Sequence, residues 1–127
     1  MKLSITKEFE FDAAHKLGTE TEIFGKCSNL HGHTYKMFVT VSKKILDNGM
    51  VINFTTLKKI VNESIINYLD HSYLNEVEWL KNDLTTCEIM VQKIWDRLEP
   101  HLISKDIHLQ KLELFETPTS KATLERK

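Results

Sequence analysis

The feature that most constrains the fold is an alternation of apolar and polar side chains in two segments near the N-terminus. In residues 3–15 the odd positions are apolar or histidine, with Lys7 as the exception, and most even positions are polar. Residues 31–41 repeat this pattern, with Phe38 as the exception. A period of two with one apolar face predicts a half-buried β-strand, so the chain is expected to begin with two strands.

Two helices are predicted in the middle of the chain. In residues 54–69 apolar side chains recur at steps of three and four, and residues 86–98 carry a second stripe with the same period. Thr85 and Glu88 have the spacing of a capping box at the start of the second helix. Pro100 is expected to mark the end of that helix.

Two more strands are predicted near the C-terminus. Residues 107–115 are rich in apolar side chains, and residues 121–126 form a shorter candidate. The resulting order, ββααββ, is typical of an α+β fold in which two helices cover one face of an antiparallel sheet. The other face of this sheet is expected to contact water or another subunit.

Composition limits the classes of function that fit this chain. Its 127 residues predict a single domain over residues 1–127. The 17 Lys and Arg residues are balanced by 18 Asp and Glu residues, which disfavours a nucleic-acid partner. No window approaches the roughly 20 apolar residues of a membrane span, and the N-terminal segment lacks the apolar core of a secretory signal. With only two cysteines, the chain is expected to be cytoplasmic.

Three histidines fall where the first two predicted strands should meet. His15 ends the first strand, and His31 and His33 begin the second. An antiparallel hairpin puts these strand ends side by side, and residues two apart project from the same face. Three histidines with an open fourth position are the ligand set of a catalytic zinc, so we predict one zinc ion per chain. The alternative is two half-exposed strand histidines and one buried, hydrogen-bonded histidine.

Cys27 lies four residues before His31, in the long connection between the two strands. A thiol near a bound cation has a lowered pKa and can act as a general base. The same residue could instead be a fourth zinc ligand, which would close the site and make it structural. A third possibility is a reduced cysteine without a role. Cys87, in the first turn of the second helix, is interpreted as a packing residue.

Acidic residues and a fourth histidine complete the set of candidates. Asp70 and His71 follow the first helix directly. The aspartate can set the tautomer and basicity of the histidine if the two side chains face each other. Alternatively, a histidine cation complements the dipole at the C-terminus of the helix, and the sequence alone favours this second interpretation. Glu116 ends the third strand and is either a solvated carboxylate or an anchor for a planar guanidine-like edge. Glu88 is explained by the capping box.

Several of these residues stand in motifs of a known family. The chain resembles the 6-pyruvoyltetrahydropterin synthase / 6-carboxytetrahydropterin synthase family in blocks that span nearly its whole length. These blocks are Phe11-Asp12-Ala13-Ala14-His15, Cys27-Ser28-Asn29-Leu30-His31-Gly32-His33, Gly49-Met50-Val51-Ile52-Asn53-Phe54, Leu69-Asp70-His71-Ser72-Tyr73-Leu74-Asn75, Thr86-Cys87-Glu88 and Glu116-Thr117.

The resemblance implies a tunnelling fold (T-fold), in which subunits join their sheets into a barrel, commonly a hexamer built from two trimers. The implied substrate is 7,8-dihydroneopterin triphosphate, and the implied zinc ligands are the three histidines described above. It further implies that Cys27 accepts a proton and that Asp70 and His71 form a second proton-transfer pair. Glu116 would grip the amino-pyrimidine edge of the pterin, helped by Thr86 and Glu88 near the start of the second helix.

Two features point to different products within the family. The three-residue gap between Cys27 and His31 resembles the bacterial branch, a lyase of queuosine biosynthesis that forms 6-carboxytetrahydropterin and releases acetaldehyde and triphosphate. Asn53 is more similar to the 6-pyruvoyltetrahydropterin branch, which eliminates triphosphate. We give more weight to the gap, because it sets where the thiol lies relative to the metal. An alternative of another class is a non-catalytic barrel protein whose structural zinc is held by one cysteine and three histidines.

Overall fold

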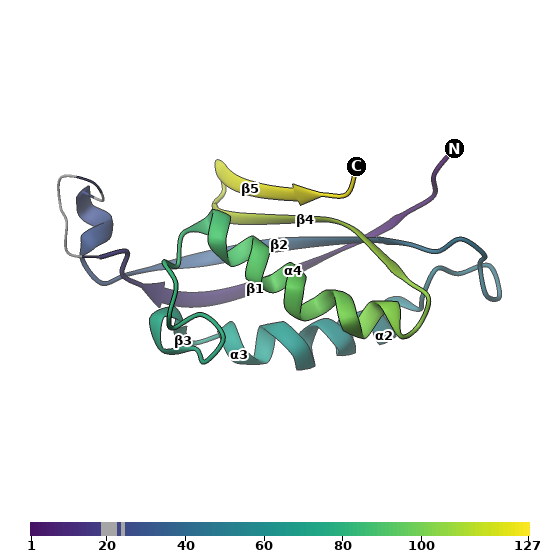
Figure 1. Cartoon of the computed structure of the whole chain (residues 1–127), viewed down its shortest axis with the longest axis horizontal. Helices are drawn as coiled ribbons and strands as arrows, with labels where there is room; N and C mark the ends of the chain where they lie inside the picture. Colours follow the sequence, from purple (N-terminus) through teal and green to yellow (C-terminus); the bar gives the residue numbers. More distant parts are fainter. Residues whose placement is uncertain (19–22, 24) are drawn as a thin grey trace.

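The computed structural model contains a five-stranded sheet with helices on one side (Figure 1). It describes residues 1–18, 23 and 25–127, so part of the connection between the first two strands lies outside the described residues. The strand order is β3-β1-β2-β4-β5. The bounds are Ile5–His15 (β1), His31–Ser42 (β2), Ser72–Tyr73 (β3), His108–Thr117 (β4) and Ser120–Glu125 (β5).

The four predicted strands are confirmed, and the sheet has one addition. The two-residue strand β3 pairs in parallel with β1, whereas the other neighbouring strands are antiparallel. The sheet is therefore mixed rather than purely antiparallel. A strand of two residues is too short to leave a periodic pattern in the sequence, which explains why it was not predicted.

The first predicted helix is confirmed as one continuous segment with a change of pitch. It consists of α2 (Phe54–Val61), a π-helical turn η2 (Asn62–Ile66) and α3 (Asn67–Leu69). Asn53 caps its N-terminus by accepting a hydrogen bond from the backbone N–H of Thr55. Short 3₁₀ turns occur at η1 (Gly25–Ser28) and η3 (Leu74–Glu76).

The second helix, α4 (Cys87–Ile103), differs from the prediction at both ends. Thr86, not Thr85, is the N-cap, and its side chain accepts from the backbone N–H of Ile89. The capping box with Glu88 is therefore wrong by one residue. Pro100 lies inside the helix, because the buried Leu102 beyond it keeps the last turn packed on the core despite the missing N–H.

The core lies between the sheet and the two helices, which run side by side on the same side of the sheet (Figure 1). The inward side of α4 is an apolar stripe of Met90, Val91, Ile94, Leu98 and Leu102. On the hairpin, the buried odd positions run from Phe9 to His15 on β1 and from Tyr35 to Val41 on β2, and Thr40 and Ser42 are buried as well at the end of β2. None of the helices among the described residues covers the opposite face of the sheet, where Phe38 and Phe115 pack edge to face with ring centroids 5.7 Å apart.

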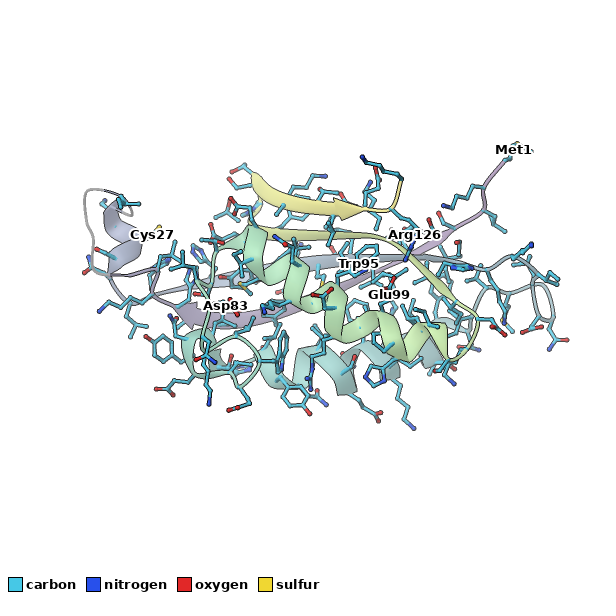
Figure 2. The ribbon with its side chains drawn as sticks, in the orientation of Figure 1. Met1, Cys27, Asp83, Trp95, Glu99 and Arg126 are labelled. Atoms are coloured by element: carbon cyan, nitrogen blue, oxygen red, sulfur yellow. The ribbon has the colours of Figure 1, made fainter. Side chains whose placement is uncertain are left out.

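The C-terminal edge of the sheet is fastened to α4 by Arg126. Its Nε donates to the carbonyl of Leu109 over 3.0 Å, and its guanidinium pairs with Glu99. The same guanidinium lies 5.5 Å from the ring centroid of Trp95 (Figure 2). These contacts hold the residue that follows β5, which is an edge strand, against the helical layer.

The connection between β2 and α2 contains a tight turn at Asp47-Asn48-Gly49, a sequence that is typical of turns. Asp47 and Met50 exchange two backbone hydrogen bonds of 3.0 and 2.9 Å. Asn48 and Gly49 both have positive φ, at 52° and 76°, which is the backbone of a type I′ turn.

Among the described helices, none combines the length and the apolar character needed to cross a bilayer.

Replacing Leu98 by alanine should lower the free energy of unfolding by roughly 2–5 kcal/mol, because its fully buried side chain would leave a cavity between α4 and the sheet. The matched control is Ile103→Ala at the end of the same helix, where 57% of the residue is exposed and the change should stay within about 0.5 kcal/mol. Urea unfolding followed by circular dichroism measures both. Equal losses in the two variants would contradict the packing face assigned to α4.

Candidate metal centre and active site

The β1–β2 register brings the three predicted histidines together. His15 is opposite His31, and Ala13 is opposite His33. The three ring centroids are 4.5, 5.3 and 4.9 Å apart, and one nitrogen from each ring lies within 4.8 Å of the others. The predicted convergence of the side chains is therefore confirmed, at the end of the sheet next to the helical layer.

In two of these rings, a hydrogen bond occupies one nitrogen and leaves the other nitrogen available to a metal. His15 Nδ1 lies 2.9 Å from the carbonyl of Thr85, and His31 Nδ1 lies 2.7 Å from the carbonyl of Asn29. A carbonyl only accepts, so each Nδ1 carries the hydrogen and each Nε2 keeps its lone pair. Both Nε2 atoms are buried and have no hydrogen-bond partner among the described residues. Metal-bound histidines show this same arrangement, so the residues fit a metal ion.

Burial lowers the pKa of His15, and the nearby His31 and His33 lower it further, although the backbone bond to Thr85 and the carboxylate of Glu116 act in the opposite direction. Burial also lowers the pKa of His33, again opposed by Glu116. Both rings are therefore neutral at neutral pH, which is the protonation state that coordinates a metal.

Glu116, at the end of β4, faces the histidine cluster. Its Oε1 lies 3.7 Å from Nε2 of His15 and 3.7 Å from Nε2 of His33. The interpretation as a solvated strand end is therefore incomplete, because the carboxylate also borders the metal site. The sequence carried a signal for this position, since Leu112, Leu114 and Glu116 share the inward parity of β4.

Asp70 and His71 are in contact, with Asp70 Oδ2 3.1 Å from His71 Nδ1. The backbone N–H of Asp12 donates to Asp70 Oδ1 over 2.9 Å, and the backbone N–H of His71 donates to the carbonyl of Asp12. The helix ends at Leu69, and His71 has a left-handed backbone with φ of 58°. The backbone of His71 is therefore paired with β1, and its side chain faces the Asp70 carboxylate.

Two cavities connect these groups. One of about 480 Å³, on the face without helices, is lined by Phe38, Phe115, Glu116 and His33 among others. A second of about 500 Å³ is lined by Asp12, His71 and again His33. Gly32 and Thr34 border both cavities. A small molecule at His33 can therefore reach Glu116 on one side and His71 on the other.

The remaining predicted residues are not part of the histidine cluster. Cys27 is half-buried in η1, at the end of the molecule where β1 ends (Figure 2), and its thiol is not one of the three clustered ligand atoms. Thr86 is occupied in capping α4, and Glu88 is exposed on its first turn. Cys87 donates to the carbonyl of Leu114 over 3.0 Å, and burial raises its pKa to about 11, in agreement with a packing role.

Sequence reasoning missed two residues beside the histidines. Thr85, fully buried, was assigned to the helix cap, yet it accepts from His15. Tyr35, also fully buried, stacks on Phe11 and lies with its ring centroid 5.7 Å from that of His33. Tyr35 shares the parity of His31 and His33, so the alternation could have placed it under the site, whereas nothing in the sequence marks Thr85.

Comparison with known proteins identifies the family of this chain. The model of the family described as "6-pyruvoyl tetrahydropterin synthase" matches residues 4–127. The chain belongs to this family. The family consists of enzymes that act on pterins, and membership supports a tetrahydropterin synthase activity for this chain.

Relatives of both product types are similar to it. A 6-carboxy-5,6,7,8-tetrahydropterin synthase from Haemophilus influenzae is 35% identical over 91% of this chain and 94% of that protein. A 6-pyruvoyl tetrahydrobiopterin synthase from Dictyostelium discoideum is 36% identical over 89% of this chain and 88% of that protein. Because these identities are nearly equal, overall similarity does not select the product.

The fold agrees with a solved member. The 6-pyruvoyl tetrahydropterin synthase of Caenorhabditis elegans superposes with a TM-score of 0.78 at 28% identity, covering 98% of this chain and 96% of that one. Two helices packed on a five-stranded sheet are therefore the T-fold that was expected for the single chain.

The metal-free protein should lose stability as the pH falls below about 6.5, because unfolded histidines bind protons there while His15 and His33 still resist protonation. The unfolded state then binds more protons, so acid favours unfolding. Urea titrations between pH 7.5 and 5.5 in the presence of a chelator measure this dependence. His15→Gln should flatten it, whereas His101→Gln at an exposed site should not; identical slopes in the wild type and His15→Gln would contradict the assignment.

Proposed function

We propose that this protein is a zinc-dependent 6-carboxy-5,6,7,8-tetrahydropterin synthase. It would convert 7,8-dihydroneopterin triphosphate and water to 6-carboxytetrahydropterin, acetaldehyde and triphosphate, a step of queuosine (7-deazaguanine) biosynthesis. The observation that carries the proposal is the cluster of three histidines, two of them with an available Nε2 atom, beside a cavity that also reaches His71 of the Asp70–His71 pair. Family membership and the short gap between Cys27 and His31 support it.

His15, His31 and His33 would hold the zinc. When bound, zinc supplies a Lewis acid that polarises hydroxyl oxygens of the substrate side chain and so acidifies the neighbouring C–H bonds. Burial keeps two of the ligand rings neutral, and the cavities that meet at His33 leave one side of the cluster open to a substrate.

Proton transfer is assigned to two groups on different sides of the substrate. The Cys27 thiolate would accept a proton from the substrate side chain. His71 would deliver or remove one on the other side through Nε2, because its Nδ1 faces the Asp70 carboxylate at 3.1 Å. Asp70 would then fix the orientation of the ring.

Glu116 would pair with the amino-pyrimidine edge of the pterin through two parallel hydrogen bonds. The adjoining cavity of about 480 Å³ falls within the usual range for ligand sites, and Phe38 and Phe115 give it an apolar wall. Thr86 and Glu88 would assist at the start of α4, and their present positions at the helix cap and on an exposed turn make them secondary contacts.

We further propose that the chain assembles as a cytoplasmic homohexamer of two trimers. The sheet face without helices carries the stacked Phe38 and Phe115, and joined sheets would enclose this face inside a barrel. Light scattering should then give six times the chain mass of 14.8 kDa.

A 6-pyruvoyltetrahydropterin synthase is the second candidate, favoured by Asn53 and by the relative from Dictyostelium discoideum. Mass spectrometry of the product formed from dihydroneopterin triphosphate distinguishes the two. We expect 6-carboxytetrahydropterin together with acetaldehyde; a pyruvoyl product without acetaldehyde would assign the chain to the other branch.

Cys27→Ala should lower turnover by about 10²-fold or more while one zinc per chain is retained, because a general base is lost and no ligand is removed. The matched control is Cys87→Ala, whose thiol bonds to a strand carbonyl and which should keep nearly full turnover. Steady-state kinetics and metal analysis of both variants are the measurements. Loss of zinc from Cys27→Ala would show that the thiol is a ligand and would favour a structural site with one cysteine and three histidines.

A further inference from the structure

The structure assigns a positioning role to Asn75 and Thr85, two residues that hold His15 from outside the histidine cluster. We propose that they set the metal affinity of the site by fixing the end of β1 and the ring of its last residue. This inference rests on the proposed metal site, and neither residue would touch the metal or the substrate.

Asn75 fixes the backbone directly after His15. The N–H of Lys16 donates to Asn75 Oδ1 over 2.9 Å, and Asn75 Nδ2 donates to the carbonyl of Lys16 over 2.7 Å. The β1–β2 ladder ends at His15, so Lys16 has left the strand pairing that holds the preceding residues. The paired amide continues the restraint of the backbone for one residue beyond the strand.

Thr85 fixes the ring of His15. Besides its carbonyl at 2.9 Å, its hydroxyl oxygen lies 3.2 Å from His15 Nδ1. Both residues are completely buried, so water does not compete for these bonds. The ring is thereby held in the tautomer that leaves Nε2 available and is restrained against rotation about its side-chain bonds.

The two residues form one network. The Thr85 hydroxyl donates to Asn75 Oδ1 over 3.5 Å, a long bond, which leaves its oxygen free to accept from His15. The chain of contacts therefore runs from the Lys16 backbone through Asn75 and Thr85 to the ring of His15. These contacts begin and end at the terminus of β1, which positions His15 as a metal ligand.

The same network links the segments that carry the other proposed catalytic groups. Asn75 follows β3, which pairs with β1 directly after His71. On the other side, the N–H of Leu17 donates to the carbonyl of Cys27 over 2.9 Å. Asn75 thus restrains His15 at the point where the Cys27 segment and the His71 segment both attach to β1.

The test compares Thr85→Val with Thr85→Ser in the full-length protein, with Zn²⁺ competed against a chromophoric chelator. Valine keeps the side-chain volume and the backbone carbonyl but removes the hydroxyl, so we expect zinc affinity to fall about tenfold. Serine keeps the hydroxyl and should restore affinity to within about threefold of the wild type. The visible spectrum of the Co²⁺ form reports the ligand geometry independently of turnover.

Asn75→Ala provides a second arm, with exposed Asn82→Ala as its control. We expect Asn75→Ala to weaken zinc binding about 10- to 100-fold and Asn82→Ala to leave it unchanged. Thermal unfolding of the chelator-treated proteins separates this effect from general destabilisation. If Asn75→Ala does not fold, the valine and serine pair at Thr85 decides the question.

The outcomes separate this inference from the proposed function. A wild-type protein that binds no stoichiometric zinc would overturn both. Wild-type affinity in Thr85→Val, or equal losses in the valine and serine variants, would overturn the positioning role of the hydroxyl and leave the metal site intact. Loss in Thr85→Val, recovery in Thr85→Ser and a changed Co²⁺ spectrum would establish the role.

Discussion

The register of the β1–β2 hairpin is the constraint on which the rest of the structure depends. The register that puts His15 opposite His31 also buries Phe11, Tyr35 and Met37 on the same face. A slip by one residue would turn every side chain of one strand to the other face. Burial of each large apolar side chain contributes about 1.5–3 kcal/mol, so the core holds the register far more strongly than the histidines could. The packing of the hairpin therefore determines the geometry of the site.

The site marks the point where the apolar core ends and polar groups begin. The inward face of the hairpin changes from aromatic and aliphatic residues to three histidines, and β4 changes from Leu114 to Glu116 at the same level. Imidazole nitrogens that are buried without a partner destabilise the folded chain by about 1–3 kcal/mol each, and a bound cation would remove that penalty. Metal binding and folding should therefore be coupled at this end of the sheet.

Much of this arrangement could be predicted from the sequence because a period of two is a local signal with a fixed spatial meaning. It located the long strands and the convergence of the histidines. Features that depend on tertiary contacts were missed. Thr85 contacts the ring of His15 through its carbonyl as well as its hydroxyl, which no side-chain pattern reveals, and its apparent capping spacing was off by one residue. The contact between Asp70 and His71 depends on a left-handed backbone at a residue other than glycine, which spacing does not indicate.

The type I′ turn at Asn48-Gly49 lies at the opposite end of the molecule from Cys27 (Figure 1, Figure 2). Between them runs β2, whose 12 residues span roughly 40 Å at about 3.3 Å per residue. An exposed turn closed by its own two backbone bonds is a natural place for added sequence. A reporter peptide or fluorescent label attached there would be remote from the chemistry, so turnover and assembly could be followed in the same molecules.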